Sequence, residues 1–459
     1  MTNIVNVTSH WRNVIIVLNA RFVPSQRGGA YIYGVVQHAL RVADLLRSRG
    51  ANVGFLLYHR TDGISHPVVE KERVVSDFPG VRFRFHFEMD RSALVRAYRS
   101  AVDLVSRGWA EGGDDAPPLL YHQTSVLLPF TPPELDGVVT HHSPFVEDVV
   151  AAIGESGAKR AFDWDHPKAD LLARMQAEGI AVVANRRNVR CAEISPIQER
   201  FLRRRGVPAH RISSLPQPLE GGGDGAVSHE GVAAIEALIA RTDAAAAMAG
   251  GRRPLVAVTA VSRLDYFKNV ELFVEGCCRS LARGDIRNAV VVGGFERDEE
   301  RDRLTAMIPN EWKDAFLFEP RMPRAALVGA LFPRLAGRGV FVCSSRFDLV
   351  PYTALEAART GLCTVAPDNG TVGAASYLPR AYTFAPTADG MAEILHTLAS
   401  ESWALRRFDE TALRIRSATS DRAFAAAFEE IGRLLRDEHS APHSPCSSPS
   451  SKTRASRKS

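Results

Sequence analysis

Short strand-like apolar runs alternate with amphipathic stretches along most of the 459-residue chain. In the N-terminal half these runs cover residues 14–18, 53–58, 81–87, 119–122 and 137–141. Several are separated by apolar residues at helical spacing, as in 30–49, which is followed by Gly50, a residue typical of helix C-termini. Apolar strands that alternate with helices are typical of a parallel sheet covered on both faces. The pattern therefore predicts an α/β fold for this half.

The same alternation restarts after a connector between Pro216 and Pro254 that is rich in Gly, Pro and Ala. The strands predicted there cover residues 255–261, 289–293, 315–318, 339–344 and 363–366. The helices predicted between them cover residues 270–282, 299–307, 324–333 and 352–360. Two doubly wound halves joined by such a connector predict a cleft protein whose ligands bind at the carboxyl ends of the strands.

The chain thus divides into five predicted segments. An N-terminal domain covers residues 1–218, a linker 219–253 and a C-terminal domain 254–419. A terminal helix follows at 420–439, and its apolar face consists of Phe424, Phe428, Ile431 and Leu435 at helical spacing. Residues 440–459 are rich in Ser, Pro and basic residues without apolar periodicity, so we expect a disordered tail.

Composition excludes several classes of protein. The net charge is +5, but the last twenty residues carry four positive charges and no acidic residue, so the rest has a net charge of only +1. Such a balance argues against nucleic acid as a partner. The six cysteines form no CxxC pair, which predicts free thiols in a reducing compartment. We expect a cytoplasmic protein without an integral membrane segment, because no long apolar run and no signal sequence is found.

Two cations follow the first strand of the C-terminal half. The run 255–261 leads into a loop that carries Arg263 and Lys268 just before a predicted helix. Two cations near a helix N-terminus suit a diphosphate, because both the side chains and the helix dipole favour its negative charge. A surface Arg and Lys that merely flank a turn are the alternative interpretation.

Two carboxylates and a pair of glycines follow other strands of this half. Asp348 comes after the run 339–344, and Glu356 lies eight residues later in the next predicted helix. An ionised carboxylate accepts hydrogen bonds from sugar or ribose hydroxyls. Solvated charges on either side of a helix start are the alternative. Gly293-Gly294 ends another strand, which allows a close backbone approach or a tight turn.

These three features, in this order, resemble the GT4-like group of retaining nucleotide-sugar glycosyltransferases, which have the GT-B fold. The group's "GRLxxxKG" loop corresponds to Ser262-Arg263-Leu264 through Lys268-Asn269, and its "vGxG" strand end to Gly293-Gly294. Its E-x7-E motif corresponds to Asp348-x7-Glu356, and its "EAxAxGxPVV" to residues 356–365. The likeness is specific over 255–373. It implies two Rossmann-like domains that face each other across a cleft.

The resemblance implies roles for the matched residues. Arg263 and Lys268 would hold the donor's pyrophosphate in place of a metal, so that neither metal nor cofactor is required. Glu356 would bind the ribose hydroxyls. Asp348 would face the transferred sugar, with help from the backbone N–H groups of Leu349 and Val350.

Further donor contacts are implied at Gly294 and, in the N-terminal half, at the glycine loop Gly28-Gly29. A histidine near the end of an N-terminal strand usually contacts the donor sugar or the acceptor in this group. We take His122 as the first candidate, in a catalytic role, and His142 as the second, at the acceptor. A core histidine is the alternative for each.

Some positions depart from the group's pattern. Asp348 replaces the customary Glu and is one methylene shorter, and Asn269 stands where Gly is usual. Asp163-Trp164-Asp165 forms a DxD, the metal–diphosphate signature of the other transferase fold, but it follows no apolar strand and we interpret it as a surface loop. His141-His142 lacks a third ligand at zinc spacing.

The sequence therefore predicts a retaining, metal-independent glycosyltransferase. It would move a sugar from a nucleotide-activated donor to a small-molecule or glycan acceptor. Two alternatives remain open at this stage. One is a degenerate member that binds nucleotide sugars without turnover, which the Asp348 departure favours. The other is a nucleotide-sugar epimerase with the same fold.

Overall fold

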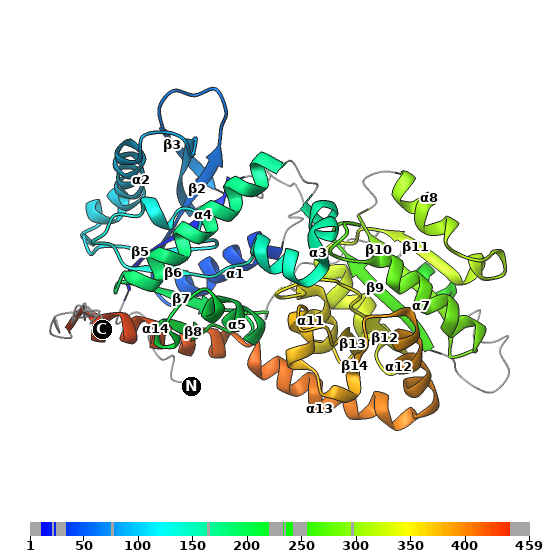
Figure 1. Ribbon diagram of the computed structural model, residues 1–459. Coiled ribbons are helices and arrows are strands. Elements are labelled where there is room, and N and C mark those ends of the chain that lie inside the picture. Colours follow the sequence, from blue (N-terminus) through cyan, green and yellow to red (C-terminus); the bar gives the residue numbers. More distant parts are fainter. Residues whose placement is uncertain are drawn as a thin grey trace, which may run out of the picture.

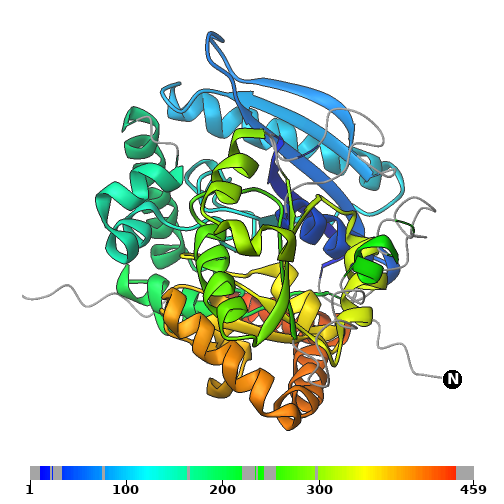
Figure 2. The ribbon, with the colours of Figure 1, turned by 90° about the vertical axis from the view of Figure 1, so that its right-hand side faces the viewer.

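The computed structural model describes residues 11–20, 23, 34–74, 78–162, 166–219, 233, 236–241, 255–294 and 298–440. Within them the chain forms two α/β halves, each built on its own sheet (Figure 1). In Figure 2 the C-terminal half lies in front of the N-terminal half. The strand–helix alternation of the sequence predicted this architecture, and the structure confirms it.

The N-terminal sheet has eight strands in the order β3-β4-β2-β1-β5-β6-β7-β8. The strands are β1 (Asn13–Asn19), β2 (Asn52–Arg60), β3 (Val68–Val74), β4 (Phe78–Phe85), β5 (Leu119–His122), β6 (Gly137–Val139), β7 (Val189–Glu193) and β8 (Ile212–Ser214). All neighbours are parallel except β3 and β4. The run Val14–Leu18 lies at the centre, in register with β2 and β5, and is almost completely buried.

Strand β3 was not predicted from the sequence. Its residues are mostly charged, and it lies at the sheet edge, where Glu70 and Glu72 pair with Arg84 and Arg82 of β4. Charged side chains are typical of edge strands, because they discourage pairing with other chains. Because an edge strand can be polar, a search for apolar runs does not find this strand.

Helices cover both faces of this sheet. They are α1 (Gly34–Ser48), α2 (Arg91–Glu111), α3 (Val146–Phe162), α4 (His166–Asn185) and α5 (Pro196–Arg204). One core lies between the sheet and α1, and it includes Val14, Ile16 and Tyr121. The opposite core lies between the sheet and α2, and it includes Ile15 and Leu120. Alternate residues of one strand thus enter different cores, as the two-residue period of a strand requires.

The C-terminal sheet has six parallel strands in the order β11-β10-β9-β12-β13-β14. They are β9 (Leu255–Val261), β10 (Ile286–Gly293), β11 (Phe316–Pro320), β12 (Gly339–Val342), β13 (Cys363–Pro367) and β14 (Thr383–Phe384). Its helices include α7 (Val270–Ala282), α8 (Asp298–Ala306), α11 (Tyr352–Arg359) and α12 (Ala388–Ser400). Single-turn helices are η3 (Leu128–Phe130), η4 (Ala209–Arg211), η5 (Asn310–Ala315), η7 (Gly373–Tyr377) and η8 (Arg380–Tyr382).

The helix predicted over 324–333 is not a single α-helix. It consists of α9 (Arg324–Ala326), the π-helical turn η6 (Leu327–Leu331) and α10 (Phe332–Leu335). Pro333 lacks an N–H, and its ring crowds the carbonyl four residues earlier. A widened turn before this proline relieves that clash, which the spacing of apolar residues alone does not reveal.

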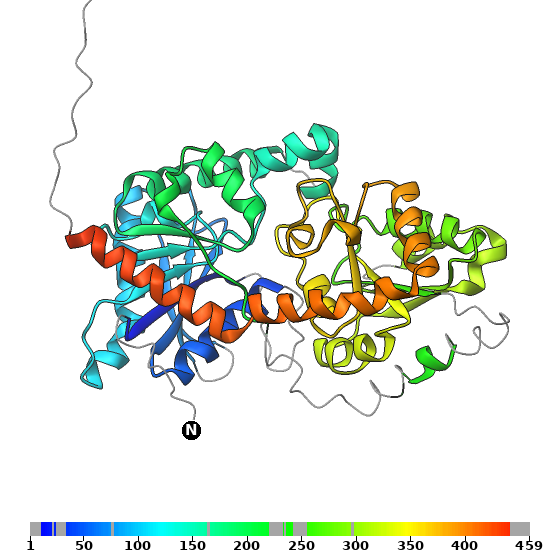
Figure 3. The same cartoon turned by 90° about the horizontal axis from the view of Figure 1, so that it is seen from below.

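Two helices at the end of the described chain run along both halves (Figure 3). Helix α13 (Ser402–Ala418) lies on the C-terminal half, and α14 (Asp421–Ser440) crosses to the N-terminal sheet. The apolar face of α14 enters the core that also contains α1, through Phe424, Phe428, Ile431 and Leu435. None of the described helices is both long and apolar enough to cross a bilayer.

Candidate active site

Two cavities border the start of α11 in the C-terminal half, and the larger one is also lined by residues of α1 in the N-terminal half. The smaller, of about 50 Å³, is lined by Thr259, Ala260, Val261, Ser262, Lys268, Phe341, Cys343, Ser344, Ser345, Asp348, Pro351, Tyr352, Thr353 and Ala354. The larger, of about 260 Å³, is lined by Gly34, Gln37, His38, Leu40, Arg41, Asp44, Pro218, Leu219, Arg324, Tyr352 and Glu356. Tyr352, at the start of α11, lines both cavities.

An ion pair between Lys268 and Asp348 is the central feature of the smaller cavity. The Lys268 ammonium donates to the Asp348 carboxylate, and both side chains are largely buried. Burial acts to lower the pKa of Lys268, but the attraction of Asp348 outweighs it and raises that pKa. Lys268 therefore stays charged in the ligand-free protein.

The loop between β9 and α7 holds the other predicted cation nearer to solvent. The Arg263 guanidinium pairs with Asp265 at 2.9 Å, and its side chain is nearly half exposed. Asp265 also accepts from the Lys268 N–H at 3.1 Å, so one carboxylate contacts both cationic residues. Asn269 ends the loop in the left-handed region at φ 50°, a conformation that Asn tolerates better than most residues. It thus takes the conformation for which Gly is the usual choice.

The loop that carries Asp348 is fixed by a turn later in the chain. The Asp348 N–H donates to the Thr371 carbonyl at 3.0 Å, and the Gly373 N–H donates to the Asp348 carbonyl at 2.8 Å. A Cβ at Gly373 would lie only 1.8 Å from the Leu349 carbonyl oxygen, so the approach requires glycine. The side chains of Leu349 and Val350 in this loop are buried.

Glu356 lies in the larger cavity, on the second turn of α11. Its side chain is 8% exposed, and its carboxylate forms an ion pair with Arg324 at the start of α9. Burial raises the pKa of Glu356, although Arg324 and, more weakly, Arg359 oppose the increase. Arg324 was not identified from the sequence as a site residue. The feature that could have indicated it is its position shortly after β11, at the carboxyl edge of the sheet.

The two candidate histidines lie in different environments. His122 is completely buried at the end of β5, where its ring stacks on Tyr98 of α2 and contacts the Thr131 hydroxyl at 3.4 Å. Burial lowers the pKa of His122 to about 3. Its position in the α2 core agrees with the core alternative.

His142, by contrast, lies at the boundary between the halves. Its Nδ1 is 3.3 Å from the Tyr352 hydroxyl, and its ring centroid is 4.7 Å from that of His38 on α1. Its buried Nε2 has no hydrogen-bond partner among the residues that the structure describes. Burial lowers the pKa of His142 to about 3, so the imidazole is neutral at pH 7. Sequence reasoning did not find the neighbouring His38.

Gly294 lies where the backbone of β10 approaches that of β9, and the other residues of interest lie outside the described ranges. A Cβ at Gly294 would lie 2.5 Å from the Ser262 carbonyl oxygen, so glycine is needed there for β10 to end beside β9. Gly28-Gly29 and the DxD at 163–165 lie outside the described residues. Among the described residues, no cluster of three His, Cys, Asp or Glu could hold a metal ion.

An aromatic cluster joins the halves next to the ion pair. Phe162 of α3 packs edge-on against Phe267 at a centroid distance of 5.4 Å, and Phe201 of α5 stacks on Phe347 at 5.9 Å. Phe267 precedes Lys268 and Phe347 precedes Asp348 in the sequence. Each charged residue is thus adjacent to an aromatic side chain that contacts the N-terminal half.

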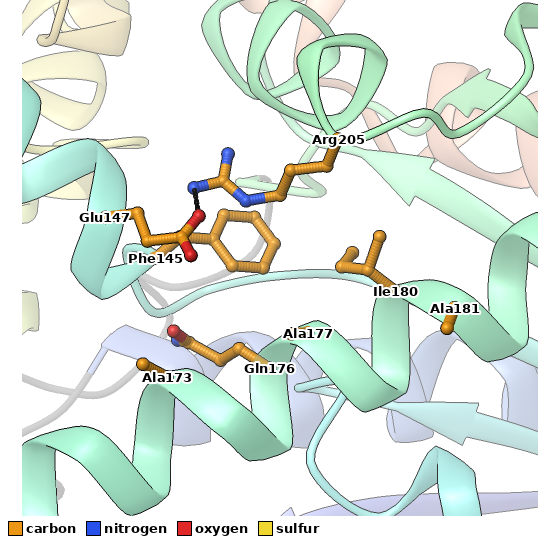
Figure 4. A pocket seen from close by; sticks show the side chains of 8 residues that line it. All are labelled: Phe145, Glu147, Ala173, Gln176, Ala177, Ile180, Ala181 and Arg205. Atoms are coloured by element: carbon orange, nitrogen blue, oxygen red, sulfur yellow. Dashed lines mark hydrogen bonds and ion pairs between the residues drawn. The ribbon is translucent and has the colours of Figure 1, made fainter.

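A third cavity lies away from these residues, between α3, α4 and α5 (Figure 4). It measures about 200 Å³, and Ala173, Ala177 and Ile180 form its apolar wall. Figure 4 shows the Arg205 guanidinium paired with Glu147 beside the Phe145 ring. None of the residues that the sequence singled out lines this cavity.

The fold matches that of several solved glycosyltransferases. Sucrose-phosphate synthase from Thermosynechococcus elongatus is 16% identical, with 93% of this chain and 100% of that chain covered at a TM-score of 0.59. An α,α-trehalose-phosphate synthase from Burkholderia xenovorans, in complex with glucose-6-phosphate, is 15% identical, with 92% and 100% covered at a TM-score of 0.55. Anabaena HepE, in complex with UDP and glucose, is 12% identical, with 94% and 100% covered at a TM-score of 0.55.

The sequence matches no protein-family model and no curated protein. At these identities the structural likeness shows the fold, which is GT-B, as the motifs predicted.

Proposed function

We propose that the protein is a retaining glycosyltransferase that moves a sugar from a nucleotide-activated donor to a small-molecule or glycan acceptor. The observation that supports this most strongly is the Lys268–Asp348 pair, which lies at the carboxyl edge of the C-terminal sheet beside the cavity of Glu356. One cation and two carboxylates, buried together, offer complementary contacts to a diphosphate, a sugar and a ribose.

The C-terminal half binds the donor in this proposal. Lys268 and Arg263 contact the pyrophosphate and take the place of a metal ion. Glu356 accepts hydrogen bonds from the ribose hydroxyls, and Asp348 accepts them from the transferred sugar. The N-terminal half binds the acceptor, and α14 keeps the two halves together.

The transfer itself needs little covalent chemistry from the protein. The bond between the sugar's anomeric carbon and the phosphate oxygen breaks, and its electron pair goes to the phosphate. The acceptor oxygen bonds to the same face of that carbon, and its proton passes to the departing phosphate. Lys268 and Arg263 stabilise the charge that develops on this phosphate, a contribution of several kcal/mol, about 3 for a single donor in other enzymes.

His142 supports the transfer as a neutral imidazole. Its contact with Tyr352 brings it to the C-terminal half, and its Nε2 is left to contact the donor sugar or the acceptor. We therefore propose His142 in the role that the sequence assigned first to His122. The acceptor class is suggested by the Burkholderia xenovorans enzyme, whose structure contains glucose-6-phosphate.

Donor binding and transfer are tested in sequence. UDP, GDP and ADP are first compared by the increase in melting temperature of the full chain. Ligand at about 100 times its dissociation constant should stabilise the protein by about 2.7 kcal/mol. Glucose and mannose donors of the preferred nucleotide are then incubated with sugar phosphates, with and without EDTA. NMR of the product reports the anomeric configuration. Failure of every nucleotide to bind would refute the proposal, and an inverted product would refute the retaining mechanism.

A further inference from the structure

Arg324 is the cation that contacts the buried carboxylate of the larger cavity. Its Nε donates to the Glu356 carboxylate, and its Nη2 donates to the Leu219 carbonyl at 3.3 Å. Leu219 lies in the first part of the connector and is the last described position before residue 233. The guanidinium therefore joins three parts of the chain: α9, α11 and the start of the connector.

The Glu356 carboxylate needs a cation beside it to remain ionised. The Glu356 side chain is 8% exposed and that of Arg324 is 20% exposed, so water screens the pair only weakly. Burial penalises the charged form of a carboxyl group and raises its pKa. Ribose hydroxyls donate well to a carboxylate but find fewer acceptor positions on a protonated carboxyl group.

Two other described cations near Glu356 have hydrogen-bond or ion-pair partners elsewhere. Arg359 lies on the same helix, but its guanidinium donates to the Thr419 carbonyl and hydroxyl. Arg41 lines the cavity from α1 and pairs with Asp421 of α14. The other titratable residues of the cavity are Asp44, Tyr352 and His38; burial lowers the pKa of His38, which therefore stays neutral at pH 7.

We propose that Arg324 is a positioning residue for the nucleotide: it holds Glu356 ionised and oriented toward the ribose and ties this carboxylate to the connector at Leu219. The inference rests on the proposed function, in which Glu356 binds the ribose. The ion pair occupies one carboxylate oxygen through a single N–H, so acceptor capacity remains for two ribose hydroxyls. Arg324 therefore need not leave when the nucleotide binds.

Arg324→Gln tests the proposal through the pH dependence of nucleotide binding. Calorimetry measures the affinity of the full chain for UDP, GDP or ADP between pH 5.5 and 8.5. The ratio of wild-type to variant affinity cancels the titration of the phosphate groups. We expect this ratio to increase as the pH falls, by up to about tenfold per pH unit between the pKa of Glu356 in the variant and its lower pKa in the wild type. At pH 8.5 the two proteins should differ least.

Three further variants separate this role from a structural one. Arg324→Lys keeps the charge and should restore a pH profile close to that of the wild type. In the Glu356→Gln background, Arg324→Gln should add no pH dependence, because the titrating group is absent. Arg334→Gln removes an exposed ion pair with Glu236 and should leave both affinity and profile unchanged.

The possible results distinguish a failure of the role inferred for Arg324 from a failure of the proposed glycosyltransferase function. Parallel pH profiles of the wild type and Arg324→Gln would overturn the inference while nucleotide binding stands. Failure of the wild type to bind any of the three nucleotides would refute the proposed function and the inference with it. If Arg324→Gln does not fold, the uncharged variant Arg324→Met takes its place in the same comparison: parallel profiles contradict the proposal, and an affinity ratio that increases as the pH falls supports it.

Discussion

The Lys268 ammonium and the Asp348 carboxylate are in direct contact, although 80 positions separate them in the sequence. Sequence reasoning assigned them to different parts of the donor, one to the pyrophosphate and the other to the sugar. Their contact means that each neutralises the other before the donor arrives. In the proposed function, donor binding would redistribute these two charges, with Lys268 turning to the phosphate and Asp348 to the sugar hydroxyls.

Asp348→Asn should consequently separate binding from turnover. The substitution releases Lys268 from its partner, so affinity for the free nucleoside diphosphate should stay equal or increase. Turnover should fall, because the sugar loses a charged acceptor. Glu356→Gln should weaken binding of donor and free diphosphate alike, since both contain the ribose. Calorimetry and initial rates check the two effects, and an equal loss of diphosphate binding in both variants would contradict the separation of roles.

Asp348→Glu shows whether the site is built around the shorter side chain. The added methylene moves the carboxylate by about 1.5 Å, the length of one carbon–carbon bond. A misplacement near 1 Å in an active site can cost about a hundredfold in rate. We expect slower transfer from the native donor, measured as initial rate. Faster transfer would instead indicate a site that has lost activity through the shorter side chain, because the longer Glu would restore the contact with the donor sugar.

Removal of either cation should weaken donor binding. Arg263→Ala and Lys268→Ala each remove a charge-assisted contact, which is usually about 1.5–3 kcal/mol, or tenfold and more in affinity. Lys268→Ala should also lower the melting temperature, because it leaves the buried Asp348 without its cation, whereas the half-exposed Arg263 should not. Activity should survive EDTA. Strict dependence on a divalent ion would bring the DxD at 163–165 back as the metal site.

The two histidines should respond differently to substitution. His142→Asn should reduce turnover with little change in stability, because its ring lies at the boundary between the halves beside Tyr352. His122→Asn should lower the melting temperature, because its ring stacks inside the α2 core, and the remaining folded protein should turn over normally. Rates normalised to folded protein, with thermal melts, check both. A catalytic loss confined to His122→Asn would support the original assignment.

Glu193 should make stability depend on pH. This buried carboxyl group ends β7, and burial followed by repulsion from Glu199 raises its pKa to about 8. The folded chain thus holds a proton that the unfolded chain releases between pH 4.5 and 8, so this stability is lost as the pH rises. The slope is at most about 1.4 kcal/mol per pH unit for one proton. Glu193→Gln should stabilise the protein increasingly up to pH 8, and a constant difference in melting temperature would contradict this.

The last helix should be essential and the tail dispensable. Phe428 of α14 is buried against Tyr121 and Trp11, so Phe428→Ala should cost about 3–5 kcal/mol of unfolding free energy. Truncation after Thr419 removes the entire helix and should unfold or loosen the N-terminal half. Deletion of residues 440–459 should leave the melting temperature and transfer rate unchanged. Full activity after the longer truncation would show that the helix is not needed.

The local sequence determined much of the fold. Continuous apolar runs such as 14–18 and 255–261 predict buried parallel strands. Neighbouring residues of a strand point to opposite faces of the sheet, so a strand that is apolar throughout must be covered on both faces. The same pattern places Lys268, Asp348 and Glu356 at strand ends or just after them, at the edge where this fold binds ligands. The apolar face of α14 was also visible in its helical spacing.

Tertiary structure decided which of these groups meet. Whether His122 enters a core depends on which face of β5 α2 covers, since alternate strand residues point to opposite sides. The Lys268–Asp348 and Arg324–Glu356 pairs join loops and helices from different β–α units, brought together only when parallel strands pair. Local patterns carry information over a few residues. Ion pairs between distant residues arise from packing that buries both charges in one place.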